Sequence, residues 1–360
     1  MLQCGGCLFN RKTNRINAAS LIFSLFVLFS FCGKATSQEA ATEARTDSKT
    51  ADSLQTPGVI YHLGPDQSFR YDKPQAFQFL KNVPKDLASY CAGTFQKKNV
   101  LKIGAMAAMT ALLVAYDQPI YEGTTKLGRR WNISRKDETK TYISAFGIPV
   151  FRGPSDFGST LYFIGDGWTH MTIAVSFLGY GLVAGDNRAL QTASQLAEGM
   201  LTTGLSTQFL KHITGRESPV VADAPGGVWR VFPNQRDYHK HVSNYDAFPS
   251  GHLATAMMTV TVIAENYPER KYIRPLGYCL LTLLSFQMMN NGVHWASDYP
   301  LALAMGYSMG KIAVKRGRKL IDRNKSADNI DNRRELLTSV RLKPLTAQQN
   351  GVSLEIVFQF

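Results

Sequence analysis

Two histidines stand beside residue types that favour phosphoryl transfer. Residues 249–252 read Pro-Ser-Gly-His, and His294 is followed four residues later by Asp298. One imidazole can attack phosphorus while the other protonates the leaving oxygen. An upstream lysine, Lys211, together with the amides of the Ser-Gly turn, can hold the phosphate oxygens. This set predicts a phosphoryl-transfer site.

The spacing of these residues suggests a role for each. His294 and Asp298 would share one face of a helix, where the carboxylate fixes the imidazole tautomer. Ser250 is a favoured helix N-cap, and the exposed amides of a first turn bind anions. Gly251 lets the backbone approach an oxyanion, and His252 then reaches a leaving group. The alternative is that both stretches only cap helices.

The pattern resembles the type 2 phosphatidic acid phosphatase (PAP2)/vanadium haloperoxidase superfamily. That family has three motif blocks, which read Lys-x6-Arg-Pro, Pro-Ser-Gly-His and Ser-Arg-x5-His-x3-Asp. The middle block is complete at 249–252, and Lys211, His294 and Asp298 take their places in the outer two. The resemblance runs from about residue 97 to 318.

Two positions depart from the family. Ser218 and Met288 stand where its phosphate-binding arginines are expected, so the chain resembles a divergent member. Arg216 lies two residues before the first of these positions, and we predict that it contacts substrate together with Lys211, Ser250 and Gly251. Basic residues of the segment 219–248 are further candidates to replace the missing charge. His239 and His241 in that segment have no cysteine nearby, and we do not expect them to form a metal pair.

The resemblance implies an all-α helical bundle of about six core helices and a phosphohistidine at His294. It implies no metal and no cofactor. Substrates in the family are phosphomonoesters and lipid phosphates, including phosphatidic acid, phosphatidylglycerol phosphate and undecaprenyl pyrophosphate. The alternative function is a catalytically weakened or inactive envelope protein that binds an anionic lipid or acts as a scaffold, because losing two charged contacts weakens transition-state binding.

Composition and charge indicate the cellular location and the class of binding partner. The chain has 360 residues and a net charge of +13. Residues 1–37 contain four basic residues, no acidic ones and an apolar run from Ala18 to Phe31, which predicts a signal peptide, although an uncleaved anchor fits the same pattern. An exported basic protein favours an anionic substrate or membrane surface over nucleic acid. We therefore expect a periplasmic or cell-envelope location, soluble or membrane-associated.

Apolar periodicity predicts the helices that carry the motifs. The stretch 59–95 has no clear element pattern, and 123–154 reads as a basic loop. The runs of 15–18 residues slightly favour buried helices over lipid-facing ones. The predicted helices are 100–115, 168–184, 190–211, 251–266, 275–289 and 296–314.

The chain ends in a near-alternating apolar pattern, which predicts a strand. Cys91 and Cys279 are not expected to pair. The sequence thus divides into a signal peptide (1–37), a disordered leader (38–57), an N-terminal extension (58–95), a PAP2-like helical domain (96–322), a charged linker (323–345) and a C-terminal strand (346–360).

Overall fold

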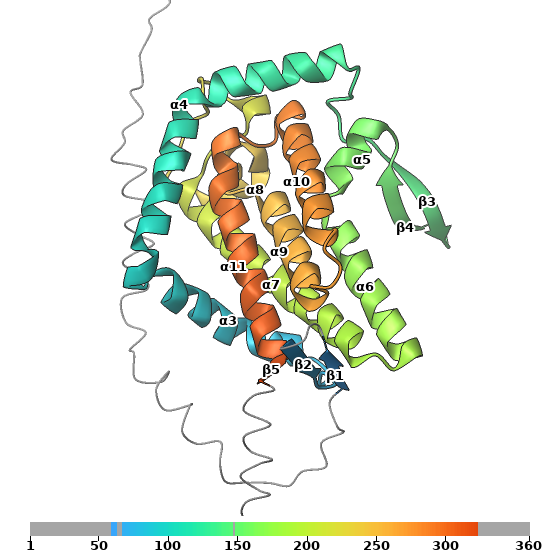
Figure 1. The fold of residues 1–360 in the computed structure, drawn as a ribbon. Coiled ribbons are helices and arrows are strands. Elements are labelled where there is room, and N and C mark those ends of the chain that lie inside the picture. The colour runs from blue at the N-terminus through green and yellow to red at the C-terminus, as the bar shows by residue number, and fades with distance from the viewer. Residues whose placement is uncertain (1–58, 63–66, 147, 323–360) are drawn as a thin grey trace, which may run out of the picture.

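Four helices pack side by side at the centre of the molecule (Figure 1). The computed structural model describes residues 59–62, 67–146 and 148–322. Fully buried side chains such as Leu253 and Leu284 fill the space between the helices, each stabilising the fold by about 1.5–3 kcal/mol. The all-α bundle expected from the sequence is confirmed. The four helices are α7 (Asn187–Thr214), α9 (Gly251–Asn266), α10 (Ile273–Asn290) and α11 (Tyr299–Gly317).

Capping residues fix the ends of the helices that carry the motifs. The Asp186 carboxylate accepts a hydrogen bond from the Ala189 N–H at the start of α7. Gly215 ends the helix with φ of 52°, a left-handed conformation that glycine adopts at little cost. Ser250 caps α9 by accepting a bond from the Leu253 N–H, as its sequence position predicted. These ends place Lys211 in the last turn of α7 and His252 in the first turn of α9.

Most predicted helices agree with the structure to within a few residues. The exception is the first, because α4 (Val100–Arg130) does not end before Asp117 and Pro119. Figure 1 shows α4 bent into two arms, one alongside α11 and one across the end of the bundle. Proline inside a helix removes one hydrogen bond and kinks it, and the burial of Asp117 holds the chain across the break.

Small sheets and the helix α3 occupy segments that have no clear local pattern in the sequence. Strands β1 (Val59–His62), β2 (Gln67–Tyr71) and β5 (Lys319–Asp322) form a sheet in the order β1-β2-β5, with both pairs antiparallel. α3 (Gln78–Thr94) packs on α7 and α11. The hairpin of β3 (Thr139–Ala145) and β4 (Ile148–Pro154) corrects the loop predicted for 123–154.

Several sequence predictions lie outside the described residues. These are the signal peptide, the leader, the charged linker and the C-terminal strand. The boundary between the N-terminal extension and the helical domain stays a prediction. Within the described chain, Cys91 and Cys279 are both free thiols.

Apolar side chains face outward on α4 and α6 (Gly167–Ala184). Val183 on α6 is 91% exposed and Leu101 on α4 is 84% exposed. Only His170 and Gly181 are buried in α6, so the expectation of mainly buried helices is wrong for these two elements. In the described part of the chain, Lys97–Arg130 is long and apolar enough to cross a membrane. Exposed apolar surface of this kind marks contact with a partner or with lipid.

Candidate active site

The motif residues predicted from the sequence meet at one end of the bundle. His294 lies between α10 and the short helix η4 (Ala296–Asp298), and its ring centroid is 6.2 Å from that of His252. A side-chain carbon built on Gly251 would lie 3.9 Å from the Lys211 ammonium nitrogen, so the cation sits beside the Ser-Gly turn. Two helices, α7 and α9, and the turn that contains His294 therefore bring one cation and two imidazoles together at the first turn of α9.

The His294 ring is held at one nitrogen and free at the other. Its Nδ1 lies 2.7 Å from the Ala247 carbonyl oxygen, which can only accept, so Nδ1 carries the proton. Nε2 is then the basic nitrogen, and it is buried with no hydrogen-bond partner. An imidazole in this tautomer is ready to attack an electrophile placed at Nε2.

Asp298 supports His294 differently from the sequence expectation. Its Oδ2 lies 3.6 Å from His294 Nδ1, too far for a hydrogen bond to the neutral ring. The same oxygen accepts a bond of 2.7 Å from the Trp295 N–H. The Ala247 carbonyl thus fixes the tautomer, while the carboxylate lies close enough to stabilise a positive charge on the imidazole. Sequence spacing could not reveal Ala247, which is 47 residues away from His294.

His252 is positioned by Tyr162 of α5 (Phe157–Phe163). The Tyr162 hydroxyl lies 3.3 Å from His252 Nε2, and the two ring centroids are 5.0 Å apart. Burial, together with His294 and Lys211, lowers the pKa of His252 to about 3. The ring is therefore neutral at neutral pH. Nothing in the sequence singled out Tyr162.

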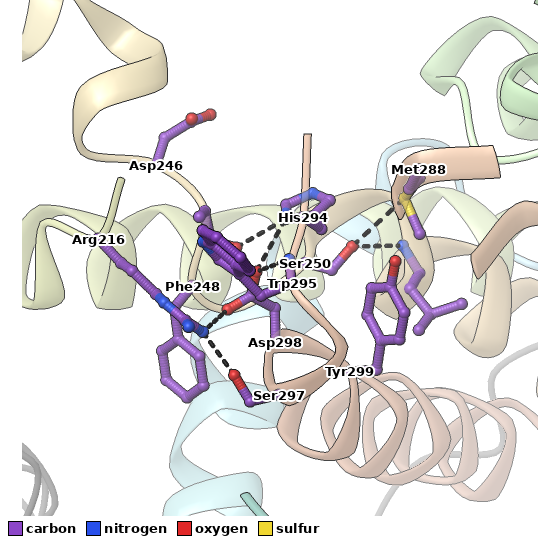
Figure 2. Close-up of polar contacts among 12 residues, drawn as sticks. Arg216, Asp246, Phe248, Ser250, Met288, His294, Trp295, Ser297, Asp298 and Tyr299 are labelled. Carbon is purple, nitrogen blue, oxygen red and sulfur yellow. Dashed lines mark hydrogen bonds and ion pairs between the residues drawn. The ribbon is translucent and has the colours of Figure 1, made fainter. Parts of the chain in front are cut away.

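The anion-binding side has lost its arginines, as expected. Met288 is fully buried in the apolar core next to Leu253 and Leu284. The Ser250 hydroxyl donates to the Met288 sulfur at 3.6 Å, as drawn in Figure 2. Ser218 is also buried, at 2% exposure. Neither position offers charge to a phosphate oxygen.

Lys211, the cation that remains at the motif positions, forms an ion pair with Asp246. Lys211 Nζ lies 3.3 Å from the Asp246 carboxylate, whose side chain is 26% exposed. Lys211 is buried at 6% exposure but Asp246 is partly exposed, so an incoming phosphate can compete with Asp246 for the ammonium group. Asp246 is a second pocket residue that the sequence did not identify.

Arg216 does not line the pocket in the manner predicted. Its guanidinium is fully buried and bonds to Asp298 at 2.5 Å and Asp117 at 2.6 Å. It also donates to the Ser297 hydroxyl and the Gly226 carbonyl. In Figure 2, Arg216 reaches Asp298 from the left and His294 lies above that carboxylate. The predicted substrate contact is therefore not supported, because these protein acceptors occupy both terminal nitrogens.

The segment 219–248 covers the Arg216 side of the site. Trp229 stacks over the Arg216 guanidinium at 4.6 Å and packs against Phe248. Arg230, a candidate replacement cation, is paired with Glu217 at 2.6 Å. Across the described chain no group of three or more histidine, cysteine or acidic residues could hold a metal ion. A compensating cation from this segment stays a prediction.

Comparison with known proteins identifies this part of the chain. Residues 192–322 match the PAP2 superfamily model. The matched stretch contains Lys211, the complete block at 249–252, His294 and Asp298, and the match supports phosphatase activity in general. No curated protein matches the chain.

Two solved structures resemble this chain weakly. LpxE from Aquifex aeolicus is 16% identical and covers 44% of this chain and 84% of its own, with a TM-score of 0.34. A transmembrane PAP2 type phosphatidylglycerolphosphate phosphatase from Bacillus subtilis is 13% identical, with coverage of 58% and 92% and the same TM-score of 0.34. Both scores are too low for either structure to inform the function of this chain.

Proposed function

We propose that the protein is a metal-independent phosphatase that hydrolyses a phosphomonoester or lipid phosphate through a phosphohistidine at His294. The observation that carries this proposal is the state of the His294 ring. Its Nδ1 donates to a backbone carbonyl and its Nε2 is buried without a partner. A nitrogen kept basic and unbonded inside a pocket costs desolvation energy, which a catalytic role explains.

The proposed reaction has two steps, formation of the phosphohistidine and its hydrolysis. Nε2 of His294 attacks phosphorus, the bond from phosphorus to the leaving oxygen breaks, and His252 gives that oxygen a proton, having been protonated in the field of the bound phosphate. A water molecule then attacks the phosphohistidine, returning its proton to His252 and releasing inorganic phosphate. Asp298 stabilises the positive charge on His294 between the two steps. Lys211 and the first-turn amides of α9 hold the phosphate oxygens.

We infer that the substrate is a lipid phosphate in the cell envelope. The exposed apolar side chains of α4 and α6 support membrane association of the same unit that carries the site. The predicted signal peptide supports export, and the basic charge supports an anionic membrane surface. Hydrolysis of lipid phosphates presented in vesicles, faster than that of a soluble phosphomonoester, is the expected preference.

The test is phosphate release from a panel of phosphomonoesters and lipid phosphates in the presence of EDTA. We expect release by the wild type and none by His294→Gln. Acid-labile phosphate should be trapped on wild-type protein and be absent from the variant. Equal release by both proteins contradicts the proposed mechanism.

A second candidate is an anion-binding protein without turnover. It is favoured by the Lys211–Asp246 pair and by the two buried positions without charge, Ser218 and Met288. A folded wild type that binds phosphatidic acid vesicles but releases no phosphate from any substrate would support this function. Binding to phosphatidic acid vesicles but not to phosphatidylcholine vesicles would show that the anion matters.

A further inference from the structure

A buried ion network joins α4 to the catalytic carboxylate. Asp117, Arg216 and Asp298 each have 0% of their surface exposed. The guanidinium uses one terminal nitrogen for each carboxylate, with N–O distances of 2.6 Å to Asp117 and 2.5 Å to Asp298. Two carboxylates therefore share one guanidinium and leave the network with one negative charge.

Every carboxylate oxygen of the network has a defined partner. Asp117 accepts the Ser297 N–H at 3.0 Å with one oxygen, and the Ser297 hydroxyl and Arg216 with the other. Asp298 accepts Arg216 with Oδ1 and the Trp295 N–H with Oδ2. Burial of three charges is costly unless each is hydrogen-bonded, and this network meets that condition at every carboxylate oxygen and at both terminal nitrogens of Arg216, while its Nε has no partner. The arrangement leaves Oδ2 of Asp298 facing His294.

Asp117 comes from outside the part of the chain that matches the PAP2 model. It lies at the bend of α4, 99 residues before Arg216. Without a second carboxylate, a guanidinium favours a bidentate pair with both oxygens of its partner. Asp117 prevents this by occupying the second terminal nitrogen of Arg216. It thereby keeps Oδ2 of Asp298 for Trp295 and for the face of His294.

We propose that Asp117 is a positioning residue for His294, acting through Arg216 and Asp298. The proposal rests on the proposed function, since it assigns a role within the same site. Asp117→Asn keeps the shape of the side chain but weakens its hold on Arg216. Arg216 then turns both terminal nitrogens toward Asp298, and Oδ2 moves away from His294. The charge that stabilises the imidazolium is lost, while the phosphate-binding groups are unchanged.

The first experiment is a double-mutant cycle on hydrolysis. Asp117→Asn is expected to lower kcat about tenfold with KM changed less than about twofold, the size of one charge-assisted hydrogen bond. In an Asp298→Asn background the same substitution should have no further effect, because its action passes through that carboxylate. Asp86→Asn is the matched control: it removes another buried carboxylate paired with an arginine, Arg316, and leaves kcat unchanged. Losses that multiply in the double variant overturn the proposal.

The second experiment does not depend on turnover. Protein labelled with 15N-histidine should show one slowly exchanging Nδ1–H resonance that disappears in His294→Gln, since that proton is bonded to Ala247. The resonance should shift in Asp117→Asn and Asp298→Asn and stay in place in Asp86→Asn. If the wild type hydrolyses nothing, the proposed function fails, and this shift still supports the network. An unchanged resonance in Asp117→Asn overturns the proposal even when the enzyme is active.

Discussion

The two sides of the pocket differ in how the protein holds them. On the nucleophile side, His294 is fixed by a backbone carbonyl and Asp298 by a buried network. On the anion side, one arginine position is an apolar methionine in the core, and the lysine is paired with a partly exposed aspartate. The side with His294 is held by buried contacts. On the other side, a phosphate can compete with Asp246 for Lys211.

For the proposed phosphoryl-transfer site, this difference suggests which part tolerates sequence change. His294 and Asp298 are held by connected buried contacts, from a backbone carbonyl and from Arg216, so a substitution in one contact is transmitted to the next. The anion clamp depends on side-chain charges that act independently. Replacement of an arginine by Met288 removes one charge and leaves the fold intact, because the methionine packs in the core.

The largest effect should come from breaking the nucleophile side. His294→Gln is expected to lower kcat by roughly 10³- to 10⁶-fold, because no other group can form the covalent intermediate. The measurement is phosphate release with a lipid phosphate substrate. His239→Gln, a histidine of the covering segment, is the matched control and should keep its activity. A loss of equal size in both variants would point to a folding defect.

Restoring charge on the anion side is expected to fail at one position. Met288→Arg places an unpaired charge in the apolar core and should destabilise the protein by about 3–5 kcal/mol. Denaturant unfolding measures this change, with Met288→Leu as the control expected to cost less than about 1.5 kcal/mol. A stable Met288→Arg protein with stronger orthovanadate inhibition would show that this position can open onto the pocket.

Freeing the lysine should strengthen anion binding moderately. Asp246→Asn removes the carboxylate that competes with phosphate for Lys211. We expect the inhibition constant for inorganic phosphate or orthovanadate to fall about tenfold, the size of one charged hydrogen bond. Asp223→Asn provides a control at an exposed aspartate of the same segment. A weaker inhibition in Asp246→Asn would mean that Asp246 orients Lys211 for the substrate.

The smallest expected effect is on the pH dependence of stability, and it arises at Glu198, a buried residue of α7 outside the site. Burial, then the neighbouring Asp86 carboxylate, raises the pKa of Glu198 to about 9. A raised pKa stabilises the fold at low pH, and this contribution is lost as the pH rises through about 9. Glu198→Gln should therefore reduce the loss of thermal stability as the pH rises from 4.5, the ordinary value for glutamate, to about 9, with kcat unchanged. A steeper loss in the variant would contradict this assignment.

Sequence alone predicted the fold and the motif residues of the site. The helices that carry Lys211, His252 and His294 were found because their apolar period and caps are local signals. Ala247, Tyr162 and the Asp117 network were not predicted, since these contacts join segments that are 47 to 180 residues apart. One signal was available: Asp117 is a single acid in an otherwise apolar helical run, and such a residue needs a buried partner.

Bending of α4 was missed for a related reason. Local rules end a helix before Pro119, whereas the contact made by Asp117 keeps it continuous. The exposed faces of α4 and α6 were missed because periodicity shows that a helix is apolar but not what covers it. Short strands such as β1 and β5 depend on partners far away in the chain and gave no local pattern.

The sheet in the order β1-β2-β5 has a mechanical consequence. β5 follows α11, whose first turn lies at the site, so the length of that helix separates the sheet from the pocket. β1 and β5 flank β2, and the two ends of the described chain therefore leave from the same end of the bundle (Figure 1). A tether attached through either end would load these strands in shear. The nucleophile would stay in place while the strands carry the force.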